Sequence, residues 1–230
     1  MSTIAINPIH RAVRFYEAPI GKKAVMAISG LILFGYLIAH MLGNLQFFLG
    51  RTVLNHYAET LHANPPLLWT VRIVLLVSAV LHIWASIELA VLKNQARPIG
   101  YVKRGNVQAS LASRTMMWSG PFVLAFIIFH LLHLTTGTVH PQFVPLNAYD
   151  NLINGLRVAP VALFYIVSMI LVGMHLSHGI WSMFQSLGFS HPKYTPLIKK
   201  FAAVFSWLLI AGFISIPLVV MAVWPASFAD

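Results

Sequence analysis

Long apolar runs separated by short polar segments dominate this chain. A helix needs about 20 apolar residues to cross a bilayer, and five runs are long enough. They cover about residues 24–49, 67–92, 115–136, 158–187 and 201–223. The pattern predicts five transmembrane helices in an all-α, polytopic bundle that forms a single membrane domain over residues 1–230.

Local signals refine the ends of these elements. Residues 1–20, MSTIAINPIHRAVRFYEAPI, lack a long apolar core, so they do not resemble a cleaved signal peptide. We expect a partly helical cytoplasmic leader that lies on the membrane or on a partner. Pro121 and Pro160 fall in the first turns of the third and fourth spans, where proline is tolerated. Pro217 falls inside the fifth span and predicts a kink.

Composition agrees with a membrane protein and narrows the chemistry. The chain is 58% hydrophobic and 9% charged, with a mean hydropathy of +0.78, which is typical of a polytopic membrane protein. The net charge of +10 comes from basic residues between the apolar runs, so it indicates topology rather than nucleic-acid binding. The absence of cysteine excludes disulfides, thiolate-held iron–sulfur clusters, thiolate-ligated haem and covalently attached haem.

Lysine and arginine are distributed unequally between the two ends of the spans. One side carries only Arg51, Arg72 and Arg157. The other carries Arg11, Arg14, Lys22, Lys23, Lys93, Arg97, Lys103, Arg104, Arg114, Lys193, Lys199 and Lys200. By the positive-inside rule, we expect a multi-pass protein of the cell (inner) membrane with its amino terminus in the cytoplasm and its carboxy terminus outside.

Four spans carry a histidine deep in the apolar segment, namely His40, His82, His130 and His175. Polar residues at such depth are costly and are usually functional. At 1.5 Å of rise per residue, each lies roughly 22–26 Å from the start of its span. Because successive spans run in opposite directions, His40 and His130 are expected near the outer face, and His82 and His175 near the inner face.

Histidines at one depth on diagonal helices of an up-down bundle can face each other across the core. Such a pair supplies one neutral imidazole nitrogen to each axial side of a haem iron, so two levels predict two haems stacked across the membrane. His133 and His178 lie one turn beyond His130 and His175. Each could be the ligand instead, or could hydrogen-bond a propionate or a quinone.

Small residues accompany the histidines at helical spacing. Those that follow a histidine are Gly43, Ala85 and Gly179. They would let a porphyrin approach the backbone, but small residues also serve ordinary helix packing in membranes, and the pattern favours neither. The dipeptides Ser29–Gly30 and Ser119–Gly120 each place a glycine ten residues before a histidine of the same span, near the inner level.

Four segments carry a family resemblance. They are GKKAVMAISGLILFGYLIAHMLGN, VLLVSAVLHIWASIELAVLKNQARPIGY, SGPFVLAFIIFHLLHLTTG and FYIVSMILVGMHLSHGIWSMFQSLG. Together they resemble the cytochrome b membrane-anchor subunit of succinate:quinone oxidoreductases (succinate dehydrogenase/fumarate reductase), in its single-subunit, five-helix, two-haem form. The resemblance covers about residues 21–223, and the H-x-x-x-G-I-W-S motif of the fourth span is its most specific part.

The resemblance implies two b haems, one held by His40 with His130 and the other by His82 with His175. The family's spacing favours these four over the histidines one turn beyond them. Arg72, at the outer level, could bind a propionate of the distal haem, or could extend to the lipid headgroups.

The resemblance also implies a function, as the membrane subunit of respiratory complex II. The chain would pass electrons from an iron–sulfur subunit to menaquinone or ubiquinone. It has no flavin fingerprint and no cluster cysteines, so dicarboxylate chemistry would lie on a flavoprotein subunit. Both partner subunits would dock on the basic cytoplasmic face formed by the leader, residues 97–104 and residues 193–200, and the complex could form a higher oligomer.

No residues of this chain clearly match the quinone-site residues of the family. Lys23 and Ser29 lie near the cytoplasmic end of the first span, where a proximal quinone lies in relatives, but they could equally be a topology anchor and a packing residue. Glu59, with His56 and His62, lies at the outer end, where some relatives have a distal site with a proton-handling carboxylate. Glu59 could also be a solvated loop charge.

Two other functions fit parts of the pattern. Cytochrome b anchors of membrane-bound hydrogenases and formate dehydrogenases share helical bundles with histidine pairs. A proton-coupled transporter with histidine relays would carry no haem. Against a transporter, the spans contain almost no acidic residues and no paired inverted halves are visible.

Overall fold

The computed structural model describes residues 8–96, 99 and 110–224 of the chain. Its helices are α1 (Pro8–Glu17), α2 (Pro19–Leu45), α3 (Arg51–His62), α4 (Pro65–Gln95), α5 (Leu111–Leu134), α6 (Ala148–Leu156), α7 (Ala159–Ser186) and α8 (Thr195–Val223). A 3-10 turn, η1 (Gln46–Leu49), follows α2. Residues 1–7 of the leader and the basic residues Arg97, Lys103 and Arg104 lie outside the described residues.

All five predicted spans are helices, and they are α2, α4, α5, α7 and α8. Each is long and apolar enough to cross a membrane, which confirms the prediction of an all-α polytopic bundle. Prolines stand in the first turns of α2, α4, α7 and α8, where the fixed φ and the missing N–H of proline suit helix geometry. They help these helices begin at or ahead of the apolar run.

Pro121 does not lie in a first turn, and that prediction was wrong. The Ser110 side chain caps α5 by accepting a hydrogen bond from the backbone N–H of Ser113 at 3.1 Å. The cap starts the helix at Leu111, so Pro121 falls inside it. Pro217 also lies inside a helix, and α8 continues through it to Val223.

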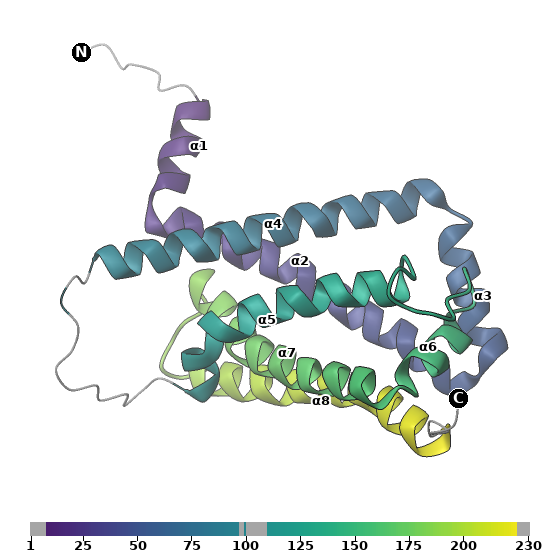
Figure 1. The fold of residues 1–230 in the computed structure, drawn as a ribbon. Helices are drawn as coiled ribbons and strands as arrows, with labels where there is room; N and C mark the ends of the chain where they lie inside the picture. The colour runs from purple at the N-terminus through teal and green to yellow at the C-terminus, as the bar shows by residue number, and fades with distance from the viewer. Residues whose placement is uncertain (1–7, 97–98, 100–109, 225–230) are drawn as a thin grey trace, which may run out of the picture.

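The long helices lie side by side in one bundle (Figure 1). α2 packs against α4, α7 and α8, while α7 packs against α5 and α8. Within the described residues, α4 and α5 make no extended contact with each other. One end of the bundle carries α1, and we call it the α1 end. The opposite end carries α3 and α6 (Figure 1), and we call it the α6 end.

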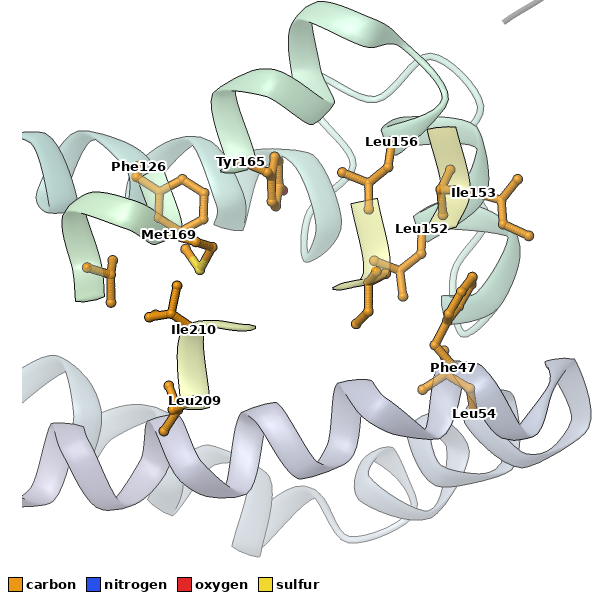
Figure 2. Close-up of a cluster of buried hydrophobic side chains, with 13 residues drawn as sticks. Phe47, Leu54, Phe126, Leu152, Ile153, Leu156, Tyr165, Met169, Leu209 and Ile210 are labelled. Atoms are coloured by element: carbon orange, nitrogen blue, oxygen red, sulfur yellow. The ribbon is translucent and has the colours of Figure 1, made fainter. Parts of the chain in front are cut away.

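Two short helices that the hydropathy pattern did not predict, α3 and α6, close the α6 end. They are joined by an ion pair of 2.8 Å between Arg51 and Asp150 and by a hydrogen bond of 3.0 Å from Asn55 to Asn147. Phe47 and Leu54 belong to the same buried apolar cluster as residues of α6 (Figure 2). The polar contacts and this cluster together fix both helices across the ends of the spans.

The sides of the bundle expose large apolar side chains. Leu76 of α4 is 66% exposed, Trp118 of α5 is 81% exposed and Leu208 of α8 is 66% exposed. Water-exposed surfaces rarely carry apolar area on this scale. The exposed sides of the helices are therefore suited to lipid, and the interior and the two ends hold the polar groups.

Candidate functional site

The structure brings the four deep histidines together in two pairs. The ring centroids of His40 on α2 and His130 on α5 are 5.7 Å apart. Those of His82 on α4 and His175 on α7 are 6.4 Å apart. These are the pairs expected from depth. Within the described residues, neither pair joins helices whose backbones pack extensively against each other, so the side chains meet across space between the helices.

The two pairs lie at different heights. The His82 ring lies beside Ser29 of α2, and the His175 ring lies beside Ser119 of α5. In both helices the histidine of the other pair follows 11 residues later, which corresponds to about 16 Å of helix. Helices α2 and α5 therefore independently indicate the same distance between the two histidine pairs. We call His82 and His175 the α1-end pair, and His40 and His130 the α6-end pair.

The histidines one turn further on have different surroundings. His133 is 2% exposed and stacks on His140 with ring centroids 4.8 Å apart. His178 is half-buried and, within the described residues, stacks on no other histidine. His130 rather than His133, and His175 rather than His178, therefore reaches a histidine of another span.

Hydrogen bonds hold the rings of the α1-end pair. His82 Nδ1 lies 3.1 Å from the carbonyl oxygen of Met26 and 3.4 Å from Ser29 Oγ. Because a carbonyl can only accept, His82 carries its proton on Nδ1, and the lone pair of Nε2 is left for a metal. Ser119 Oγ lies 3.4 Å from His175 Nδ1 and supports the second ring, but a hydroxyl can donate or accept, so this contact does not fix the tautomer.

The α6-end pair has a different set of supports. His130 Nδ1 lies 3.3 Å from the hydroxyl of Tyr165. His40 stacks on Tyr36, with ring centroids 5.4 Å apart, and its Nε2 accepts a long hydrogen bond of 3.3 Å from the Asn44 amide. That amide also donates to the His40 carbonyl at 2.7 Å, so a metal on Nε2 would replace only the weaker bond.

The ring separations in both pairs are compatible with two imidazoles binding one metal ion between them. In a linear imidazole–metal–imidazole arrangement, bonds of about 2 Å place the ring centroids about 6 Å apart, close to both observed distances. Among the described residues, no group of three or more His, Asp or Glu side chains could hold a metal ion. A metal between two imidazoles would therefore need further ligands from outside the chain, and a porphyrin supplies these as equatorial nitrogens.

The small residues near the histidines could serve either the close approach of a porphyrin or ordinary helix packing, and the structure distinguishes their surroundings. A Cβ added at Gly179 would meet nothing within 4 Å, which leaves open space one turn beyond His175. A Cβ added at Gly43 would lie 2.8 Å from the Tyr57 hydroxyl, and Ala85 has no exposed surface. Gly179 thus suits the close approach of a flat ligand, whereas Gly43 and Ala85 serve helix packing.

Lys23 and Ser29 do not form one site. Lys23 is exposed and lines a groove at the α1 end with Ile20, Met26, Ser182, Gln185 and Ser186. Ser29 is only 3% exposed, and its hydroxyl donates to the Val25 carbonyl at 2.7 Å. Ser29 therefore supports the His82 ring and is not accessible to a ligand in the groove.

Glu59 lies on helix α3 and not in a loop. Its carboxylate is 3.9 Å from His56 Nδ1, and both side chains are exposed. His56 lines a groove at the α6 end with Gln46, Thr52, Val53, Tyr57 and Thr60. His62 does not line this groove. Its Nδ1 bonds the backbone carbonyl of Ala58 at 2.8 Å.

Arg72 lies on α4, ten residues before His82. That distance along the helix is about 15 Å toward the α6 end, which brings Arg72 to the height of the α6-end pair. Its guanidinium carbon lies 5.1 Å from the centroid of the Trp69 ring.

A polar cluster at the α1 end was not anticipated from the sequence. Lys22 of α2 forms an ion pair of 3.2 Å with Glu88 of α4, and Tyr16 of α1 donates its hydroxyl to the same carboxylate. The Lys22 ammonium also lies 4.4 Å from the centroid of the Tyr16 ring. The hydrogen bond to Glu88 raises the pKa of Tyr16 above its usual value, because the carboxylate favours the protonated phenol.

Comparison with known proteins finds no match among family models, curated sequences or solved structures.

Proposed function

We propose that this chain is the di-haem cytochrome b membrane anchor of a succinate:quinone oxidoreductase. The observation that carries the proposal is the meeting of four histidines from four spans in two pairs, at ring separations suited to axial ligation. A bound haem b would supply a reversible one-electron carrier. The four segments that resemble this family favour it over other cytochrome b anchors.

The chain's own contribution is to hold and orient four imidazoles. The Met26 carbonyl would keep the His82 proton on Nδ1, with Ser29 beside it, and Ser119 is placed to accept the Nδ1 proton of a His175 that binds iron through Nε2. Such partners fix the ring orientation and raise the basicity of the coordinating nitrogen. Arg72, at the height of the α6-end pair, is suited to bind a propionate through charge-assisted hydrogen bonds.

A quinone fits the Lys23 groove better than the groove at His56. Quinone carbonyl oxygens accept hydrogen bonds, and the Lys23 ammonium, the hydroxyls of Ser182 and Ser186 and the Gln185 amide are all donors. The groove also lies at the end of the bundle nearer to the α1-end pair. Glu59 and His56 offer a second, more solvent-exposed position where a carboxylate could exchange protons.

Flavoprotein and iron–sulfur subunits would dock at the α1 end, which would face the cytoplasm. Basic side chains of the described residues gather on the segments that reach this end, among them Lys93, Lys193, Lys199 and Lys200. The spans themselves would be surrounded by lipid. The amino terminus would then be cytoplasmic and the carboxy terminus outside.

The first experiment is a haem count on the purified, detergent-solubilised protein. We expect a dithionite-reduced-minus-oxidised spectrum of a b-type cytochrome and a pyridine haemochrome value of two haems per chain. Colourless protein from cells that make haem normally would refute the proposal and would favour a transporter. Co-purification of a metal-hydride enzyme, rather than a flavoprotein, would move the chain to a hydrogenase or formate dehydrogenase.

The second experiment separates quinone reduction from succinate oxidation in the whole complex. His82→Ala should remove one haem and most succinate:quinone activity, while succinate-dependent reduction of a soluble dye survives on the partner subunits. His178→Ala is the matched control, because His178 is partly buried and pairs with no histidine of another span among the described residues, and it should retain both haems. Normal quinone turnover in a His82→Ala complex shown to lack a haem would contradict the electron-transfer role.

A further inference from the structure

Tyr165 of α7 connects two histidines of α5. Its hydroxyl lies 3.3 Å from His130 Nδ1 and 2.9 Å from His133 Nδ1. The side chain is 8% exposed, and its ring packs edge-on against Phe126 with centroids 5.2 Å apart. The hydroxyl of this buried side chain is therefore held between the two imidazoles.

The donors and acceptors allow only one direction for this chain of bonds when His130 binds a metal. A neutral imidazole that ligates through Nε2 carries its proton on Nδ1, so His130 donates to the Tyr165 oxygen. The single hydroxyl proton of Tyr165 is then free to be donated to His133 Nδ1 at the shorter distance of 2.9 Å. Donation by the hydroxyl makes its oxygen a better acceptor.

The far side of His133 is also fixed. Its ring stacks on His140, with centroids 4.8 Å apart. His140 Nε2 donates to the Asn151 carbonyl at 3.0 Å, and its Nδ1 accepts from the backbone N–H of Gln142 at 3.2 Å. Gly155 closes the remaining side, because a Cβ there would lie 2.5 Å from the His133 ring. His133 thus cannot turn away from Tyr165.

We infer that Tyr165 is the positioning residue of the α6-end haem ligand, fixing the orientation and tautomer of His130 and, with His133 behind it, setting the electron donation of that imidazole to iron. This inference rests on the proposed function. It also assigns His133 a role that the sequence left open, as the acceptor behind Tyr165 rather than a ligand. The α1-end pair has no equivalent tyrosine among the described residues and uses a carbonyl and two serines instead.

The test is Tyr165→Phe in the haem-loaded protein, which removes the hydroxyl and keeps the ring packing. Without an acceptor for its Nδ1 proton, His130 becomes a weaker donor to ferric iron. We expect the midpoint potential of one haem to rise and its low-spin ferric EPR signal to shift, while the other haem is unchanged. Tyr149→Phe is the control, because the Tyr149 ring stacks on Phe47 and its hydroxyl bonds no histidine within the described residues.

A second variant covers the case in which Tyr165→Phe does not assemble. His133→Leu keeps the Tyr165 hydroxyl but removes the group that accepts its proton, and should move the same potential in the same direction by a smaller amount. Two bound haems with potentials and EPR signals equal to those of the unsubstituted protein in the assembled variant would overturn the role of Tyr165. If the unsubstituted protein bound no haem at all, the proposed function itself would be wrong. Failure of the Tyr165 role and failure of the proposed function therefore give different results.

Discussion

Gly155 illustrates how closely the α6 end is packed at the level of single residues. A Cβ added there would lie 2.5 Å from Cε1 and 2.7 Å from Nε2 of His133, and 3.0 Å from Nε2 of His140. Both rings are almost fully buried. A glycine is therefore required at this position by the histidine stack and not by backbone conformation.

Substitution of this glycine should be costly. Gly155→Ala is expected to lower the free energy of unfolding by about 1–3 kcal/mol, which is typical of overpacking in a filled core. Gly35→Ala is the matched control, because its Cβ would meet nothing within 4 Å. In the middle of α2 the control should be neutral or stabilising by up to about 1 kcal/mol. Denaturant titration in detergent would measure both, and equal stability of the two variants would contradict the packing argument.

At the scale of elements, one carboxylate links α1 to α4. Glu88 of α4 accepts a hydrogen bond from Tyr16 of α1 and pairs with Lys22 of α2. Within the described residues, α1 packs mainly against α2. The Tyr16–Glu88 bond therefore joins α1 to a second helix of the bundle.

This attachment should depend on pH. The pKa of Tyr16 is raised above its usual value of 10.0 by the hydrogen bond to Glu88. The bond therefore stabilises docking fully below about pH 10, and the stabilisation is lost as the pH rises further and Tyr16 ionises beside the carboxylate. Because the chain has no cysteine, spin labels on Val13→Cys and Val91→Cys report the α1–α4 distance directly.

The expected distance distribution is narrow at neutral pH and broadens reversibly as the pH rises above about 10. Tyr16→Phe, which cannot ionise, should show no such transition, and Glu88→Gln should be broader already at neutral pH. A transition that survives Tyr16→Phe would assign the pH dependence to another group.

At the scale of the whole molecule, the five spans place α1 and the α7–α8 connection at one end and α3 and α6 at the other (Figure 1). The unequal distribution of lysine and arginine predicts which end is cytoplasmic. The same orientation would decide at which end the proposed partner subunits dock and which histidine pair lies nearer to them.

Orientation can be tested in intact cells with single cysteines in this cysteine-free chain. Thr60→Cys, on exposed α3, should react with a membrane-impermeant maleimide added from outside. Ser190→Cys, in the exposed α7–α8 connection, should react only after the cells are permeabilised. The reverse pattern would invert the topology and move the proposed docking face to the α6 end.

The amino-acid sequence by itself predicted the five spans and two levels of histidines, but it left His133 and His178 open as alternatives to His130 and His175. Hydropathy and helical rise are local properties, so a run of apolar residues defines a span, and counting residues from its start gives the depth of His40, His82, His130 and His175. It did not determine α3 or α6, because their apolar stripes are short and their ends depend on contacts such as Arg51–Asp150.

Only the tertiary structure decided the surroundings of the histidines. The contacts of His82 with Ser29, of His175 with Ser119, of His130 with Tyr165 and of Lys22 with Glu88 join residues 35 to 66 positions apart in the chain. The two Ser–Gly dipeptides mark Ser29 and Ser119 in the sequence, but no local pattern shows that these serines contact histidines of other spans or distinguishes Tyr165 from the other tyrosines. Their roles arise from helix packing, because the rotation of each helix about its axis decides which side chains reach the space between the spans.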